Sequence, residues 1–330
     1  MTQIGKCTKM CPQSEINEHK SEFLSIFECD PNGKFDPTLA IKKYSRSSAG
    51  FQANLNNVRP VDVLYKTLQH INSKIVIPNL KSPIETQIKM YHYVRDRLRA
   101  VNQDITIQQA HSPEITCIYE YYIAFFIWSG INFRNLPPSD FDFVQNFDQI
   151  SEGFLSLLEE YKFYPSKNQD LYYSAYVASL FCTDQFQENL SKFKIESHFY
   201  IVKSVRTAYL TDNIKLFLNT IKHAPFIILY TVILSDKQIY TNCISSLRLS
   251  FKSTSFNPDV LLNEFELSEN YDQIKTAFNI NPKGDYLTFD ISKQIQIEQT
   301  PYFILPSSIE EYHNSHEFHL EFSKISEIDL

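Results

Sequence analysis

The sequence predicts a mainly α-helical protein, in which a stack of helical repeats is capped by a C-terminal winged helix. Three observations support this prediction. Between residue 36 and about residue 252, apolar residues recur at helical spacing in segments that short polar breaks separate. Glycine, with 6 of 330 residues, is far below its average share of roughly 7%, which argues against an architecture rich in tight turns. Near residue 255 the pattern changes to short helical segments followed by a hairpin.

The composition argues against several classes of protein. Hydrophobic residues make up 43% and charged residues 21%, which is typical of a packed soluble chain. The longest apolar patch, residues 121–128, is much shorter than the roughly 18 residues of a transmembrane helix. No apolar block follows the N-terminal lysines, as it does in a secretory signal. The short apolar patch leads us to expect no membrane span. The six cysteines are scattered, so we expect a reducing intracellular compartment.

Helix starts are indicated by a capping residue that precedes a proline. Asp36-Pro37, Ser82-Pro83 and Ser112-Pro113 each combine a side-chain acceptor with the fixed φ that suits a first helical position. Cys11-Pro12 is a weaker form of the same signal, and it opens a helix within residues 12–27. We therefore expect residues 1–35 to form an N-terminal segment that contains the first helix.

The stack is expected to extend over residues 36–252. Residues 60–77 and 83–105 carry apolar residues at helical spacing. Residues 135–140, Asn-Leu-Pro-Pro-Ser-Asp, read as a linker, and helical patterns of 12 to 20 residues continue after it.

The cap is expected over residues 253–300. Residues 257–267 and 268–278 each favour a short helix, and Pro282-Lys-Gly-Asp285 is a turn that precedes an alternating strand pattern. An acidic tail, residues 301–330, follows as a last helix or a disordered segment.

Charge is distributed unevenly along the chain, whose net charge is −7. Residues 1–110 hold 15 Lys and Arg against 10 Asp and Glu, whereas the remainder holds 16 against 28. Seven cations of this basic front are candidates for phosphate contacts with nucleic acid: Lys42, Lys43, Arg46, Arg59, Arg95, Arg97 and Arg99. Arg95 and Arg99 share a helix face, and Arg97 points elsewhere. The alternative is that some of these arginines pair with Asp96, Asp104 or helix C-termini inside the stack.

The cap has the opposite charge. Residues 257–290 hold seven acidic and two basic side chains, so this surface repels phosphate and is expected to contact protein. Eight apolar or aromatic residues are candidates for a partner interface: Phe256, Leu261, Leu262, Phe265, Leu267, Tyr286, Leu287 and Phe289. The alternative is that they form the core of the cap, which needs roughly half of them to fold.

Metal and redox chemistry are weaker hypotheses. Cys7 and Cys11 are spaced one residue wider than a usual zinc knuckle, and only His19 and Cys29 lie near enough in sequence to complete a site. A redox pair would need two intervening residues and a βαβ pattern. In the tail, histidines at 313, 316 and 319 are one residue short of a zincin spacing. No triad, phosphate loop or carboxylate pair stands out, so we expect no metal, no cofactor and no enzymatic activity.

Several stretches resemble motifs of the SAC-three/GANP family. "IGKCTKMCPQSEI" is similar to its N-terminal signature, and "IKKYSRSSAG" to a Lys-x-Tyr-x-Arg-Ser-x-Ala block. "LNNVRPVDVLYKTLQHI" and "YHYVRDRLRAVNQDITIQ" resemble two further blocks, with Val58 in place of leucine and Asn102 in place of arginine. The resemblance covers about residues 4–300. The residues that carry it are Cys7, Cys11, Pro12, Tyr44, Arg46, Arg59, Pro60, Asp96, Arg97 and Asp104.

The resemblance implies a PCI-type fold, helical repeats closed by a winged helix that pairs with a second PCI-domain subunit. It also implies a small acidic subunit of the DSS type, contact with RNA or single-stranded nucleic acid, and a role as a scaffold in nuclear mRNA export, at or near the nuclear pore. In that interpretation the cysteines of the signature are structural.

The same resemblance leaves alternatives open. Long members of the family carry phenylalanine-glycine repeats before this region and a long helix after it. The chain begins at the signature, so we expect a short member that lacks both pore tethers. The alternative role is protein binding at the centrosome or spindle, in the cytoplasm, or in transcription and splicing. The third hypothesis is a metal-dependent enzyme built on Cys7, Cys11, His19 and the tail histidines.

Overall fold

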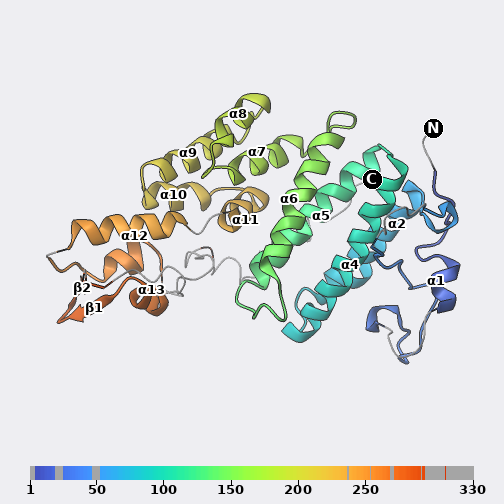
Figure 1. Cartoon of the computed structure of the whole chain (residues 1–330), viewed down its shortest axis with the longest axis horizontal. Coiled ribbons are helices and arrows are strands. Elements are labelled where there is room, and N and C mark those ends of the chain that lie inside the picture. Colours follow the sequence, from blue (N-terminus) through green and yellow to red (C-terminus); the bar gives the residue numbers. More distant parts are fainter. Residues whose placement is uncertain are drawn as a thin grey trace.

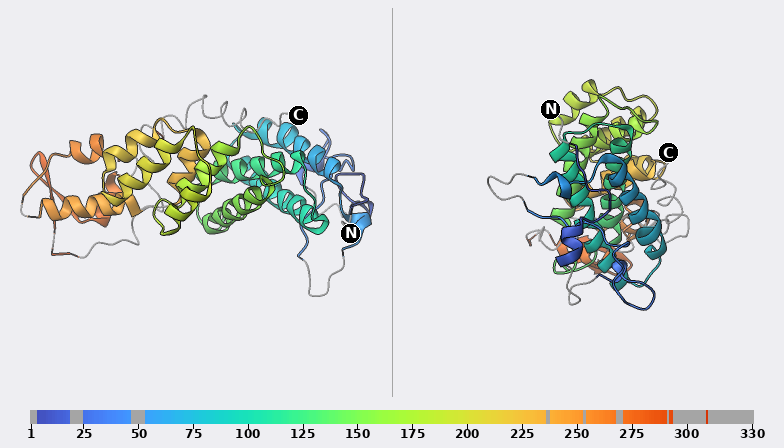
Figure 2. Two further views of the ribbon diagram at one scale, coloured as in Figure 1. Left: turned by 90° about the horizontal axis from the view of Figure 1, so that it is seen from above. Right: turned by 90° about the vertical axis from the view of Figure 1, so that its right-hand side faces the viewer.

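The computed structural model describes residues 4–18, 25–46, 53–235, 238–252, 254–267, 271–290, 292–293 and 309. These residues form an elongated, mainly helical molecule with one small sheet near the C-terminal end (Figure 1). Figure 2 shows that the elements follow one another along the long axis, from the N-terminal segment at one end to the hairpin at the other. None of the described helices is long and apolar enough to cross a membrane.

The N-terminal segment lies on the end of the stack. Its helix α1 (Gln13–Glu18) begins directly after Pro12, as predicted, and a 3-10 turn, η2 (Ile26–Glu28), follows. The predicted start at Asp36-Pro37 is wrong, because no helix begins there. The Asp36 carboxylate instead accepts hydrogen bonds from the backbone and hydroxyl of Thr38 and closes a turn.

The first long helical segment runs without a break through α2 (Val61–His70), the π-helical η4 (Ile71–Val76) and α3 (Ile77–Asn79). This confirms the prediction for residues 60–77. The π-helical stretch lies just before Pro78, whose ring nitrogen cannot donate a helical hydrogen bond.

Three long helices build the centre of the molecule. They are α4 (Ile84–Gln108), α5 (Pro113–Asn132) and α6 (Phe143–Glu160). Ser112 caps α5 as predicted, because its hydroxyl accepts from the amide of Ile115. Helix α5 is buried along almost its whole length and packs against α2, α4, α6 and α11 (Phe226–Ser235). Residues 135–140, which were expected to be a linker, connect α5 to α6, and these two helices pack against each other.

Shorter helices continue the stack toward the cap. They are α7 (Gln169–Ser179), α8 (Gln185–Lys192), α9 (Phe199–Leu210), α10 (Ile214–Ile221) and then α11. Helix α11 is apolar on all sides and buried against α5 and α7, so the core is continuous from the N-terminal half into this part.

The C-terminal part contains α12 (Gln238–Ser250), the π-helical η5 (Val260–Glu264), α13 (Tyr271–Ala277), β1 (Ile280–Lys283) and β2 (Tyr286–Phe289). The two strands are antiparallel and Lys283 faces Tyr286, so the loop has two residues. Gly284 has a φ of 63° at the first loop position, where type II′ turns need glycine. The predicted hairpin is therefore confirmed. Residues 301–330 lie outside the described residues except Ile309, so the structure says nothing of the acidic tail.

Candidate functional site

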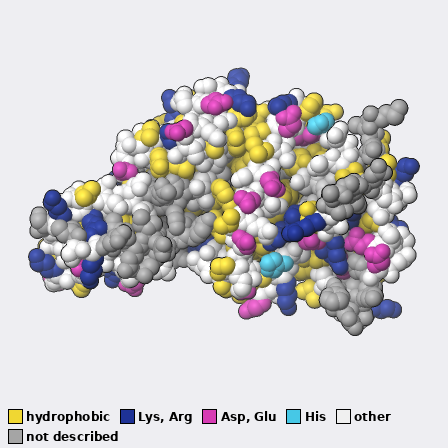
Figure 3. Space-filling view, in the orientation of Figure 1, with side chains coloured by type: hydrophobic (Ala, Val, Ile, Leu, Met, Phe, Trp, Pro, Cys, Tyr) yellow, Lys and Arg dark blue, Asp and Glu magenta, His cyan; other side chains and the backbone are white. Residues whose placement is uncertain are grey.

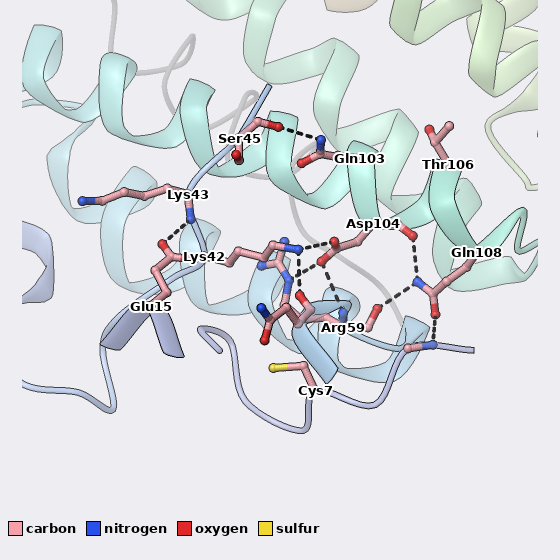
Figure 4. A network of polar contacts seen from close by, with 12 residues as sticks. Cys7, Glu15, Lys42, Lys43, Ser45, Arg59, Gln103, Asp104, Thr106 and Gln108 are labelled. Carbon is pink, nitrogen blue, oxygen red and sulfur yellow. Dashed lines mark hydrogen bonds and ion pairs between the residues drawn. The ribbon is translucent and has the colours of Figure 1, made fainter. Parts of the chain in front are cut away.

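The charged residues of the N-terminal motifs meet in a buried ionic network between the N-terminal segment, α2 and α4 (Figure 4). Arg59 Nε lies 2.7 Å from Asp104 Oδ2, and both side chains are fully buried. Lys42 Nζ lies 2.6 Å from the other oxygen of Asp104 and also donates to the carbonyl of Asn57. One carboxylate from α4 therefore neutralises two of the cations that were expected to contact phosphate.

The segment that carries Cys7 is held to the same place by backbone hydrogen bonds. The Gly5 amide donates to the side chain of Gln108, whose own amide donates to the carbonyls of Arg59 and Asp104. The Cys7 amide donates to the carbonyl of Val58. A Cβ at Gly5 would lie 2.4 Å from that carbonyl oxygen, so only glycine fits this close approach.

A second ionic cluster surrounds Arg97. Its guanidinium lies 2.7 Å from the carboxylate of Glu28 and 2.8 Å from that of Asp96. It also stacks on the ring of Tyr93, 4.1 Å from the centroid, and the Tyr93 hydroxyl donates to Glu28. Burial alone raises the pKa of Glu28, but the charge and hydrogen bonds of Arg97 outweigh burial and hold that pKa below its ordinary value.

The two signature cysteines are buried thiols. The Cys7 thiol donates to the carbonyl of Lys9. Burial, with help from the negative charges of Glu15 and Glu28, raises the pKa of Cys11 to about 12. A thiol that stays protonated is a poor metal ligand and a poor nucleophile, so the Cys11 environment favours a packing role.

The described residues contain no group of three or more His, Cys, Asp and Glu side chains that could hold a metal ion. His19 and the tail histidines at 313, 316 and 319 lie outside the described residues. The tail part of the zinc hypothesis is therefore not addressed by the structure.

The seven candidate phosphate contacts divide into two groups. Lys42, Arg59 and Arg97 form the internal ion pairs with Asp104 and Glu28. The others are more accessible: Lys43 extends away from the network (Figure 4), Arg46 is exposed, and Arg95 and Arg99 are half-buried. Arg99 stacks on Tyr44 with its guanidinium carbon 3.9 Å from the ring centroid, and Arg95 lies 6.0 Å from the Tyr91 ring.

A surface hollow of about 350 Å³ lies beside this stacked pair. Its walls come from the end of the N-terminal segment, from α4 and from α6: Tyr44, Arg99, Asn102, Gln103, Thr106, Ile107, Gln149 and Glu152. Sequence reasoning missed Gln149 and Glu152, because they lie some fifty residues after Arg99 on another helix and belong to no motif.

The cap buries six of the eight residues that were candidates for a partner interface: Phe256, Leu261, Phe265, Leu267, Leu287 and Phe289. These six pack the interior of the cap, which is the alternative that the sequence left open. Leu262 is half-buried, and Tyr286 is 55% exposed. Part of the acidic charge of the cap is also neutralised, because Glu264 pairs with Lys215 of α10 and Glu266 pairs with Lys222, directly after that helix.

Comparisons with known proteins agree with the motifs. The model of the SAC3/GANP family matches residues 10–279. The chain is 30% identical over 165 residues to SAC3 family protein 1 of Schizosaccharomyces pombe, a match that covers 49% of this chain and 15% of that protein. It is 27% identical over 167 residues to SAC3 family protein B of Arabidopsis thaliana, covering 48% and 9%. It is also 27% identical over 161 residues to Protein xmas of Drosophila melanogaster, covering 46% and 8%. The matched region is thus a small part of each relative.

Proposed function

The chain belongs to the SAC3/GANP family, and from that premise we propose that it is a non-enzymatic scaffold subunit of nuclear mRNA export. The proposal is supported by how the chain uses the charged residues of its motifs. Lys42, Arg59 and Arg97 pair with carboxylates inside the stack, where they hold the N-terminal segment and α4 together. The charged residues of the motifs therefore stabilise the fold, and we propose that other surfaces of the chain bind its partners.

The cap is proposed to be a winged helix of the PCI type. Its elements follow in the order helix, extended residue, helix, helix and hairpin. The extended residue is Phe256, whose amide and carbonyl both bond to Leu287 of β2 at 2.9 Å. It adds a third, minimal strand to the two-stranded sheet, as expected for the first strand of a winged helix.

A second PCI-domain subunit is the partner that we propose for this end of the molecule. Tyr286 on β2 is 55% exposed and Leu249, near the end of α12, is 75% exposed, so neither contributes to the interior of the cap. A contiguous exposed apolar patch is typical of a contact site, and we propose that these two side chains belong to such a patch.

A small acidic subunit of the DSS type is proposed as a further partner. Helix α9 exposes three large apolar side chains, Phe199, Tyr200 and Leu210. The Lys203 ammonium on the same helix lies 5.1 Å from the centre of the Phe199 ring. This combination of apolar area and positive charge suits an acidic chain that also carries hydrophobic residues.

RNA is proposed to contact the N-terminal end of the stack, through Lys43, Arg46 and Arg99. Three cations make a modest electrostatic contribution to binding, so the affinity for RNA should fall with added salt less steeply than for a strongly basic protein. The limited charge also favours a second candidate function, in which the chain acts through protein binding alone at the centrosome or spindle, or in transcription and splicing.

Affinity purification from the native cell, with identification of the bound proteins, tests the proposal. We expect a PCI-domain protein together with RNA-processing factors in the nuclear fraction. A bound set that contains spindle or centrosome proteins and no RNA-processing factor supports the second candidate. A set that contains no PCI-domain protein removes the scaffold proposal.

A further inference from the structure

The hollow beside Arg99 and Tyr44 has the features of a pocket for a planar ligand. It lies between α4 and α6, with a volume of about 350 Å³, enough for one nucleobase and its ribose. Figure 3 shows basic side chains toward α4 beside acidic side chains along α6 on this face of the molecule. The walls of the hollow carry one cation, Arg99, and one anion, Glu152, a mixture that does not suit a bare phosphate.

The stacking surface is the guanidinium of Arg99. One of its faces covers the ring of Tyr44, which holds the group flat. Within the described part of the chain, no hydrogen bond or ion pair involves Arg99. An arginine plane that is held by an aromatic ring and lacks polar partners is a platform on which a base can stack.

The edges of the hollow present one donor and one acceptor, each on a side chain that has a hydrogen bond to a neighbour. The Tyr119 hydroxyl donates to Asn102 Oδ1 at 3.1 Å, so the Asn102 amide NH₂ is left as a donor. The Tyr122 hydroxyl donates to Gln149 Oε1 at 2.7 Å, and Gln149 Nε2 donates to the carboxylate of Glu152 at 3.3 Å. Gln149 therefore helps to position Glu152, whose carboxylate can accept further hydrogen bonds.

Among the nucleobases, these groups match guanine. Its Watson–Crick edge offers two neighbouring donors, N1–H and the N2 amino group, which one carboxylate can accept together, and a carbonyl oxygen that accepts from an amide. Adenine, cytosine and uracil each offer a single donor group on that edge. A carboxylate that accepts from this donor would have its second oxygen facing an acceptor atom of the base, which is unfavourable.

We propose that this hollow binds a guanine base of single-stranded RNA, with the base stacked on Arg99 and its Watson–Crick edge on Glu152 and Asn102. Arg46 lies at the rim, since the carbonyl of its neighbour Ser45 accepts a hydrogen bond from Gln103 in the wall, and it contacts the adjoining phosphate. The inference rests on the RNA contact proposed above and assigns it a base preference.

The test compares labelled RNA octamers by fluorescence anisotropy, using the full chain. One octamer is all uridine, and the second carries a single central guanosine. We expect the guanosine octamer to bind about tenfold more tightly, as for one well-made base contact. Glu152→Gln removes the acceptor charge and Arg99→Lys keeps the positive charge but removes the plane, so each should abolish the preference. Glu159→Gln, an exposed position on the same helix, is the matched control and should keep it.

Each outcome has a defined meaning. Equal binding of the two octamers by the unaltered chain overturns the guanine pocket and leaves the proposed RNA contact in place. Binding of neither octamer overturns both. Guanosine monophosphate is the free-nucleotide arm: if it binds as tightly as the guanosine octamer, the ligand is a nucleotide and the RNA assignment is wrong. Thermal unfolding of each variant, matched to the unaltered chain, shows that a lost preference is not a lost fold.

Discussion

Arg59 and Asp104 form an ion pair in which both side chains are completely inaccessible to solvent, although 45 residues separate them in the sequence. Taking two charges out of water is costly, and the cost is recovered only when each charge keeps its partner. Lys42, the carbonyl of Met10 and the backbone amide of Arg59 supply further contacts to the pair. The pair therefore ties α4 to the chain before α2.

Asp104→Asn should destabilise the fold severely. The substitution leaves the buried Arg59 without its counter-charge, and breaking one partner of a buried pair typically costs about 3–5 kcal/mol. Denaturant unfolding measures the change. Asp62→Asn is the matched control, because Asp62 pairs with Lys66 on the exposed face of α2 and such pairs contribute at most about 1 kcal/mol. Similar decreases in the free energy of unfolding for the two variants would show that the buried pair stabilises the fold no more than the exposed pair does.

Gly5→Ala should release the N-terminal segment from the stack. The new Cβ would lie 2.4 Å from the Val58 carbonyl oxygen, so the backbone must shift and the hydrogen bond from Gly5 to Gln108 weakens. We expect a loss of about 1–3 kcal/mol, the usual range for overpacking. Faster thermolysin cleavage before α1 is the specific readout. Lys6→Ala, at an exposed neighbouring position, should leave both the stability and the cleavage rate unchanged.

The stability of the chain should fall with acid partly through Glu28. Burial opposes the charged form, but Arg97 holds the pKa of Glu28 below its ordinary value of 4.5. A group whose pKa is lower in the folded state stabilises the fold above its unfolded pKa, and that contribution disappears as the pH falls through the folded value. Unaltered chain should therefore lose more stability below about pH 4.5 than Glu28→Gln, which starts less stable. Parallel curves for the two proteins would contradict this account.

The thiol of Cys11 should resist alkylation in the native protein. Its pKa is raised to about 12, mainly by burial, so the reactive thiolate is scarce at neutral pH. Cys29 and Cys182, which are only half-buried, serve as internal controls in the same digest. We expect iodoacetamide to label Cys11 only after unfolding. Rapid native labelling of Cys11, or protection that disappears when a chelator is added, would point back to redox or metal chemistry.

The helices and the hairpin could be predicted from local patterns. Apolar spacing predicted the helix over residues 60–77, and the turn signal Pro282-Lys-Gly-Asp285 predicted the hairpin in which Gly284 adopts its positive φ. The failure at Asp36 has a local cause as well. An aspartate followed by proline offers the same acceptor to a turn as to a helix, and only the residues that follow decide between them.

The pairings in the network could not be predicted in the same way. Helical spacing separated Arg97 from Arg95 and Arg99, and the structure confirms that Arg97 alone of the three is buried. Its partner Glu28 lies 69 residues away, in a stretch without periodicity, so no local signal connects them. Glu152 was missed for the same reason, because α4 and α6 supply opposite walls of the hollow only in the folded stack.

The central claim is that this chain works by binding other macromolecules through surfaces that its own core leaves free. The most direct measurement is the amount of PCI-domain protein that co-purifies with the chain and with a Leu249→Asp, Tyr286→Asp double variant. Leu155→Asp, at an exposed position on α6, is the control. The account predicts strong loss of the partner for the double variant and none for the control. Undiminished recovery with the double variant, or no such partner with any of the three, would contradict it.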